Sequence, residues 1–214
     1  MKDLASYIDH TLLRPDASVR DIERLCDEAC ENGFFGVCIH SSWISRACHL
    51  LSGTSIAVVS VGGFPLGASS TETKCFETKH AFDKGATEID VVLNIGRLKQ
   101  GDDVYVGHEL YEIVRSADGN PVKIILETCF LNREEKIRAC RLAVENGAAF
   151  VKTSTGFGSA GATVADVNLL SECAGSNVGI KASGGIRDTA TALAMIEAGA
   201  RRLGTSSGVV IVKN

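Results

Sequence analysis

The sequence is short of the features that mark membrane and nucleic-acid-binding proteins. No stretch of its 214 residues approaches the ~18 consecutive apolar residues that a membrane span requires. Its formal net charge of −4 gives no basic field that would attract nucleic acid. We therefore expect neither a membrane partner nor a nucleic-acid partner.

Secretion signals and metal-binding cysteine motifs are also missing. The opening segment, Met1 to Ser6, lacks the apolar core of a signal peptide, so we expect a cytoplasmic chain whose eight cysteines stay reduced. No cysteines form a C-x-x-C, and Cys26 and Cys30 lie one turn apart on an expected helix with no histidine pattern nearby. The sequence predicts no disulfide and no metal site.

No linker, low-complexity tract or block of like charge interrupts the chain. Its hydrophobic content of 45% and charged content of 22% are those of an ordinary globular protein with one sizeable core. We predict a single domain over residues 1–214.

The chain does contain a repeated unit, in which a helix-like segment closes on glycine and leads into a short β-branched or aromatic strand. Glycine accepts the left-handed conformation just past a helix end, and such junctions occur at Gly33, Gly85, Gly147 and Gly199. Strands are expected after them at 34–39, 88–93, 150–152 and 202–205, and between them at 7–12, 56–61, 122–127 and 178–182.

Helix-start signals lie between these strands, as in Asn132 followed three residues later by Glu135, which is a capping box. Strand and helix therefore alternate through eight units, which favours an α/β fold of the (β/α)8 TIM barrel type. A doubly wound open sheet is the competing fold.

Two lysines occupy strands that should be buried on both faces. Lys152 lies in Phe150-Val151-Lys152 and Lys181 in Gly179-Ile180-Lys181. Burial and a neighbouring cation both favour the neutral amine, which is the nucleophilic form of lysine. A lysine in such a strand can instead pair with a carboxylate or extend to the surface, but two in successive strands favour a catalytic role.

The repeat also predicts which side chains meet. The fifth residue after each closing glycine is Cys38, Asp90, Lys152 or Gly204, and alternate strands of a barrel contribute to one interior layer. Unless the agreement is a coincidence of short strands, Asp90 and Lys152 meet inside the barrel. A lysine imine next to a carboxylate that moves protons through a water is the chemistry of an aldolase.

Glycine-rich turns predict where phosphate binds. Loops after strands seven and eight of a barrel often hold phosphate, and here they contain Gly184-Gly185 and Ser206-Ser207. Both could instead be simple tight turns. Residues 156–161 match the dinucleotide fingerprint G-x-G-x-x-G by letter, but they follow a late strand and lack the acidic strand end that the fingerprint requires.

Several segments closely resemble deoxyribose-phosphate aldolase. The resemblance rests on Glu88-Ile89-Asp90-Val91-Val92, Val151-Lys152-Thr153-Ser154-Thr155-Gly156, Ile180-Lys181-Ala182-Ser183-Gly184-Gly185-Ile186-Arg187, Asp9-His10-Thr11, Gly63-Phe64-Pro65 and Gly204-Thr205-Ser206-Ser207. It implies that Lys152 is the Schiff-base nucleophile and that Asp90 and Lys181 donate and accept protons. It also implies that Gly184, Gly185, Ser206 and Ser207 bind phosphate, with Asp9, Cys38 and Thr153 near the substrate.

The reaction implied by this resemblance is reversible cleavage of 2-deoxy-D-ribose 5-phosphate to D-glyceraldehyde 3-phosphate and acetaldehyde, in deoxyribonucleotide catabolism, with no cofactor. Some members of the family carry a lysine where Phe157 stands here. Another lysine-dependent aldolase with a different donor, or a phosphosugar-binding barrel without activity, is an alternative. The sequence is compatible with a monomer or a homodimer.

Overall fold

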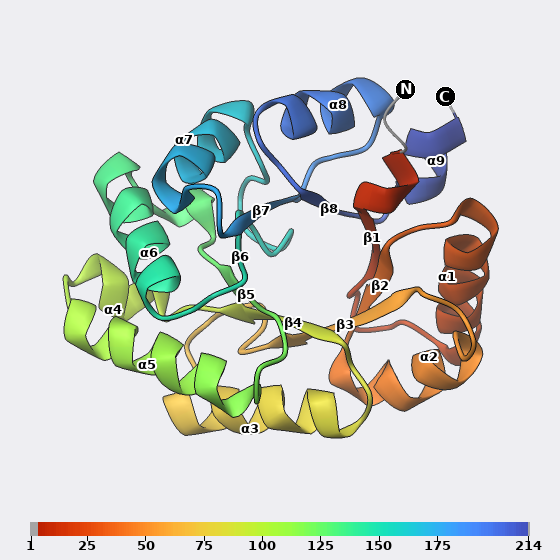
Figure 1. Ribbon diagram of the computed structural model, residues 1–214, viewed down its shortest axis with the longest axis horizontal. Helices are drawn as coiled ribbons and strands as arrows, with labels where there is room; N and C mark the ends of the chain where they lie inside the picture. Colours follow the sequence, from red (N-terminus) through yellow and green to blue (C-terminus); the bar gives the residue numbers. More distant parts are fainter. Residues whose placement is uncertain (1–3, 214) are drawn as a thin grey trace.

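The computed structural model describes residues 4–213, so Met1 to Asp3 and Asn214 of the expected domain lie outside it. Within the described chain, eight parallel strands follow one another around a closed barrel, and β8 pairs with β1 to complete it. Helices surround the barrel (Figure 1). The predicted (β/α)8 barrel is therefore confirmed, and the open doubly wound sheet is excluded.

The strands begin and end within two residues of the positions predicted from the sequence, both the four after glycine junctions and the four between them. They are β1 Ile8–Leu12, β2 Gly36–Ile39, β3 Ala57–Gly62, β4 Glu88–Val92, β5 Val122–Ile125, β6 Phe150–Lys152, β7 Gly179–Ser183 and β8 Arg202–Thr205.

The outer layer consists of α-helices joined to the strands by short loops, some of which contain 3-10 turns. The helices are α1 Val19–Asn32, α2 Ile44–Leu50, α3 Thr71–Asp83, α4 Ile95–Lys99, α5 Asp103–Ser116, α6 Arg133–Glu145, α7 Val164–Ala174, α8 Thr189–Glu197 and α9 Gly208–Lys213, and the 3-10 turns are η1 Leu4–Tyr7, η2 Ser41–Trp43 and η3 Thr128–Phe130. The predicted capping box forms at α6, where the Asn132 side chain accepts from the backbone N–H of Glu135 at 2.9 Å.

Glycine ends the helices where the repeat places it. Gly33 caps α1 at φ 64°, and Gly147 follows α6 at φ 84°, both in the left-handed region that a side chain disfavours. Each turn sends the chain directly into the next strand, so the strands start at similar heights. This regularity explains why counting from glycine gives a usable register.

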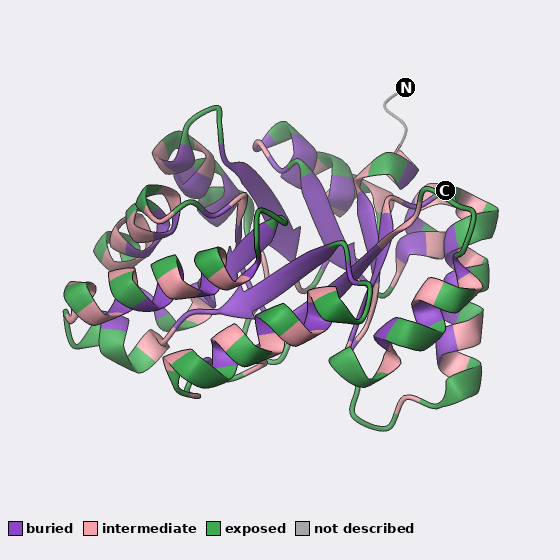
Figure 2. Ribbon diagram, turned by 60° about the horizontal axis from the view of Figure 1, so that its bottom comes forward, coloured by how far each residue is buried: buried purple, intermediate pink, exposed green. Residues whose placement is uncertain are grey.

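The apolar core lies between the strands and the helices. Figure 2 shows the strands largely buried, with a few partly exposed residues at the ends of β1, β3 and β6, and the helices buried on their inner faces. Ile124 in β5 and Leu110 in α5, for example, are both 0% exposed. The opposite, inward-facing side of several strands carries charged residues instead, among them Asp90 and Lys152, and these form the site described below.

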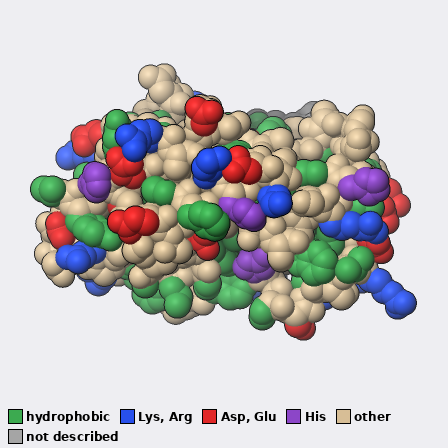
Figure 3. All heavy atoms as spheres, turned by 90° about the horizontal axis from the view of Figure 1, so that it is seen from below, with side chains coloured by type: hydrophobic (Ala, Val, Ile, Leu, Met, Phe, Trp, Pro, Cys, Tyr) green, Lys and Arg blue, Asp and Glu red, His purple; other side chains and the backbone are tan. Residues whose placement is uncertain are grey.

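The outer surface carries both signs of charge. On the face that includes α3, Figure 3 shows basic, acidic and apolar side chains interspersed, without a field of one sign. Among residues 4–213 no helix has both the length and the apolar character needed to cross a bilayer.

Candidate active site

The two lysines singled out by the sequence are direct neighbours inside the barrel. Lys152 in β6 and Lys181 in β7 are register partners, and both are almost wholly buried. Each donates a hydrogen bond to the same oxygen, Asp90 Oδ2, at 2.8 Å from Lys152 Nζ and 2.7 Å from Lys181 Nζ. Asp90 and Lys152 thus meet, as the register predicts.

Asp90 also binds a third lysine that the sequence interpretation missed. Lys123 in β5 donates from Nζ to Asp90 Oδ1 at 2.9 Å, so both carboxylate oxygens are engaged by ammonium groups. Burial would raise the pKa of Asp90, but Lys123, Lys152 and Lys181 together hold it well below its usual 3.8. Asp90 is therefore an ionised carboxylate. The signal for Lys123 was the same as for Lys152: a lysine within an apolar strand, Val122-Lys123-Ile124-Ile125.

A second set of ion pairs joins the same network at a neighbouring position in the barrel. Lys123 Nζ lies 2.6 Å from Glu88 Oε2, and Arg202 Nη1 lies 3.0 Å from that oxygen. Arg202 also donates to Asp9 Oδ1 at 2.9 Å, and Asp9 Oδ2 accepts from Lys181 Nζ. Asp9 thereby joins the site through β1, while Glu88 and Arg202 were not anticipated from sequence.

The charges of this network do not balance. Among the residues that the structure describes, four cations meet three carboxylates in the interior: Lys123, Lys152, Lys181 and Arg202 against Asp9, Glu88 and Asp90. Three of the cations each contact two carboxylates, whereas Lys152 contacts one, at an oxygen it shares with Lys181. The network thus holds one more cationic side chain than carboxylates, and Lys152 is the one with the least compensation.

The neighbours of Lys181 fix its protonation state. Burial would lower its pKa, but the carboxylates of Asp9 and Asp90 raise it above the usual 10.5. For Asp9, burial would raise the pKa, whereas Lys181 and Arg202 hold it below 3.8. Lys181 is therefore a persistent ammonium beside Lys152.

Two other predicted site residues, Thr153 and Cys38, make contacts that stabilise the fold. Thr153 is buried, and its hydroxyl bonds the backbone of Ser183, accepting from its N–H at 3.1 Å and donating to its carbonyl at 3.2 Å. Cys38 is buried in a small apolar cluster with Leu13, Val59 and Val61, and burial raises the pKa of its thiol above 9.0. Its thiol is thus a poor nucleophile.

A cavity of about 330 Å³ opens at the carboxyl ends of β1, β6, β7 and β8. Its wall includes Gly184, Gly185 and Ser206 of the predicted phosphate set, whereas Ser207 does not line it. Gly184 and Gly185 both have positive φ, at 88° and 79°. The turn is thus a glycine-dependent one that exposes backbone to the cavity.

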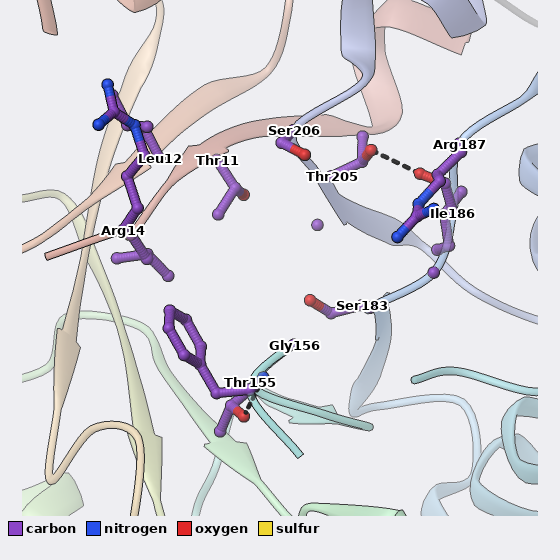
Figure 4. A pocket seen from close by; sticks show the side chains of 15 residues that line it. Thr11, Leu12, Arg14, Thr155, Gly156, Ser183, Ile186, Arg187, Thr205 and Ser206 are labelled. Atoms are coloured by element: carbon purple, nitrogen blue, oxygen red, sulfur yellow. Dashed lines mark hydrogen bonds between the residues drawn. The ribbon is translucent and has the colours of Figure 1, made fainter. Parts of the chain in front are cut away.

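Two arginines border this cavity, and the sequence interpretation assigned a role to neither. Figure 4 shows Arg14 and Arg187 on opposite sides of it. Arg14 is tied to Asp16 at 2.8 Å and to Asp21 at 2.6 Å, so its charge is compensated. Arg187 is exposed, and within residues 4–213 no carboxylate forms an ion pair with it. Arg187 is the uncompensated arginine at this cavity, and its signal in the sequence was its place two residues after Gly185.

An aromatic pair stands beside the cavity. The rings of Phe64, from the loop after β3, and Phe157, which lines the cavity, meet edge to face with centroids 5.4 Å apart. Phe157 is therefore an apolar part of the cavity wall. In the part of the chain that the structure describes, no three His, Cys, Asp or Glu side chains gather in a way that could hold a metal ion.

Comparison with known proteins agrees with this arrangement. Residues 4–214 match the DeoC/LacD family of aldolases. The chain belongs to that family. The aldolase is 54% identical to the deoxyribose-phosphate aldolase of Alkaliphilus oremlandii, over 99% of this chain and 96% of that protein. It is 53% identical to the Brevibacillus brevis enzyme of the same name, over 98% and 95%. The crystal structure of deoxyribose phosphate aldolase from Aeropyrum pernix superposes on this aldolase with a TM-score of 0.91 at 35% identity, covering 98% of this chain and 89% of that one.

Proposed function

We propose that Lys152 is the Schiff-base nucleophile of a deoxyribose-phosphate aldolase, EC 4.1.2.4, and that the cavity beside it holds the sugar phosphate. The activity follows from more than 50% identity along almost the whole chain to enzymes of that name. The residue assignment rests on one observation: Lys152 is the cation of the interior network with the fewest carboxylate contacts. We therefore assign the lysine with the least carboxylate compensation as the nucleophile.

The chemistry follows from a neutral amine at that position. Lys152 Nζ adds to the C1 aldehyde of open-chain 2-deoxyribose 5-phosphate, and the carbinolamine then loses water to give a protonated imine. A base removes the C3 hydroxyl proton, the C2–C3 bond breaks, and its electron pair flows into the imine. Glyceraldehyde 3-phosphate leaves, the resulting enamine takes a proton at C2, and hydrolysis releases acetaldehyde.

The two partners of Lys152 divide the remaining work. Asp90, ionised and held by three lysines, accepts and returns protons through a water molecule. Lys181, kept charged by Asp9 and Asp90, supplies positive charge that disfavours a second ammonium at Lys152 and donates protons to departing oxygens. Asp9 acts on the reaction through Lys181.

Phosphate recognition combines backbone and side-chain donors at the other end of the cavity. The turn at Gly184 and Gly185 brings backbone N–H groups to the wall, Ser206 adds a hydroxyl, and Arg187 supplies the charge. We assign Ser207 to the edge of this site, because its backbone N–H already donates a hydrogen bond to Thr205 Oγ1 at 2.9 Å.

Borohydride trapping with acetaldehyde, followed by peptide mass mapping, tests the assignment. We expect the label on Lys152 and none after Lys152→Met. Asp90→Asn should keep the label but slow exchange of the acetaldehyde methyl protons with solvent. Label found mainly on Lys181 would reverse the assignment of nucleophile and acid. Comparing acetaldehyde with dihydroxyacetone and pyruvate as donors distinguishes this activity from that of other lysine-dependent aldolases.

A further inference from the structure

Glu127 lies at the mouth of the barrel in a backbone conformation that suits glycine. It is the second residue after β5, with φ 55° and ψ 65°, and only 2% of its surface is exposed. Asp118 is the other non-glycine residue with positive φ in the described chain. A glycine at position 127 would avoid the unfavourable conformation. The reason for a glutamate must therefore lie in its side chain.

The carboxylate of Glu127 is bound by the loop that leaves the nucleophile strand. Both of its oxygens accept from the backbone N–H of Thr155 at 3.3 Å, and Oε2 also accepts from the Thr155 hydroxyl. Within residues 4–213 no lysine or arginine forms an ion pair with this carboxylate. Cys129 Sγ makes one further, long contact with Oε1 at 3.9 Å, so the loop supplies every nitrogen or oxygen donor that these buried oxygens have among residues 4–213.

The contact continues from Thr155 to the residues that line the cavity. Thr155 Oγ1 accepts from the N–H of Phe157 at 3.0 Å, and the next residue, Gly158, leaves room for the carboxylate. A Cβ at Gly158 would come within 3.2 Å of Glu127 Oε1 and 2.7 Å of Cys129 Sγ. The turn at 155–158 is therefore wrapped around the Glu127 side chain.

We propose that Glu127 is a positioning residue for the sugar-phosphate half of the site. Its carboxylate sets the conformation of the 155–158 turn, of which Thr155, Gly156 and Phe157 line the cavity. It acts through Thr155 and does not touch the reacting carbon. This role rests on the proposed assignment of the cavity to the sugar phosphate. The left-handed backbone at Glu127 is what brings the carboxylate under the turn.

Steady-state kinetics of three variants test this role. Glu127→Gly removes the carboxylate at a position whose dihedral angles glycine accepts, so the substitution does not strain the backbone, and its melting temperature is measured together with KM. Its KM for 2-deoxyribose 5-phosphate should rise about tenfold, the loss expected when hydrogen bonds to a charged group disappear. Imine trapping at Lys152 with acetaldehyde should be unchanged. Glu127→Gln keeps the side-chain shape and one good acceptor, so it should restore part of the KM.

Asp118→Gly is the matched control. Asp118 has φ 49° and is exposed in the turn before β5, at the opposite end of the barrel from Glu127. Asp118→Gly should relieve the same kind of backbone strain as Glu127→Gly, but it should leave the KM for 2-deoxyribose 5-phosphate unchanged. A merely structural role for Glu127 predicts lower thermal stability with KM unchanged in both Glu127 variants, and this result would overturn the proposal.

The outcome separates this proposal from the site assignment itself. Loss of imine trapping in the parent enzyme at Lys152 would refute the assignment of the nucleophile. An unchanged KM for Glu127→Gly with trapping intact would refute only the positioning role. If Glu127→Gly does not fold, the KM of Glu127→Gln decides, because an uncharged isostere must still raise it measurably. An acidic limb of the pH–rate profile that moves in Glu127→Gln would show direct participation in catalysis, also contrary to the proposal.

Discussion

Lys152 and Lys181 donate to one and the same carboxylate oxygen, Asp90 Oδ2. Two ammonium groups that both lie within 2.8 Å of one oxygen repel each other, and that single oxygen cannot compensate both charges fully. Among the residues that the structure describes, Lys181 has the Asp9 carboxylate as a second partner, whereas Lys152 contacts no carboxylate other than that of Asp90. The sharing therefore leaves Lys152 less compensated by carboxylate than Lys181, although both lysines are buried.

The charge imbalance predicts opposite stability effects for two equally buried lysines. Lys152→Met should leave the free energy of unfolding unchanged or higher, because three cations then face three carboxylates. Lys123→Met removes a partner of both Glu88 and Asp90 and should cost about 3–5 kcal/mol. Urea unfolding measures both. Equal destabilisation by the two substitutions would show that the imbalance does not matter.

The pH dependence of the reaction tests the role of Lys181. Lys181→Leu removes a neighbouring positive charge and frees the carboxylates of Asp9 and Asp90, and both changes favour the ammonium form of Lys152. The acidic limb of the pH–rate profile should move to higher pH, and the rate should fall. If the acidic limb of the pH–rate profile is the same in Lys181→Leu as in the parent, then the charge of Lys181 does not influence the reactive amine.

Acid stability should depend on Asp9. Its pKa in the folded protein lies below the usual 3.8, so its stabilising contribution is complete above pH 3.8 and is lost as the pH falls toward the lowered value. Asp9→Asn should be less stable at neutral pH, and below pH 3.8 its free energy of unfolding should fall less steeply, by up to about 1.4 kcal/mol per pH unit. Identical slopes for parent and variant would refute the linkage.

Phosphate recognition should depend more on the glycine turn than on single hydroxyls. Gly185 has φ 79°, so Gly185→Val would distort the turn that presents backbone N–H groups to the cavity. Ser206→Ala should cost only about one hydrogen bond to a charged group, ~1.5–3 kcal/mol, and Ser207→Ala less, because Ser207 does not line the cavity. Each of the three substitutions should lower kcat/KM for 2-deoxyribose 5-phosphate far more than kcat/KM for unphosphorylated 2-deoxyribose. Equal losses on both substrates would place the phosphate elsewhere.

The strands and the meeting of Asp90 with Lys152 were predictable because both depend on local signals. Glycine after each helix fixes where a strand begins, and a lysine inside an apolar run is unusual enough to notice. Lys123 carried the same signal, but the fifth residue after the preceding glycine, Gly119, is Ile124, so the count used for the other strands does not place Lys123 beside Asp90.

The remainder of the site depends on three-dimensional pairing. Glu88 and Arg202 are the first residues of their strands, where a charged residue is expected to face solvent. Arg202 reaches Asp9 only because β8 pairs with β1 when the barrel closes. The left-handed conformation of Glu127 contradicts the preference of its own residue type. It exists because the 155–158 turn supplies the donors, and a one-dimensional pattern does not contain that contact.

The acidic and basic residues of the interior ion pairs come from different halves of the chain, and this separation affects how the two halves of the barrel come together. Every carboxylate of the network comes from β1 or β4, and every cation from β5 to β8. The first half-barrel to leave the ribosome thus has an acidic inner surface, and the second a basic one. Neither half can bury its own charges without the other, so attraction between the halves favours closure while self-association of either half is disfavoured.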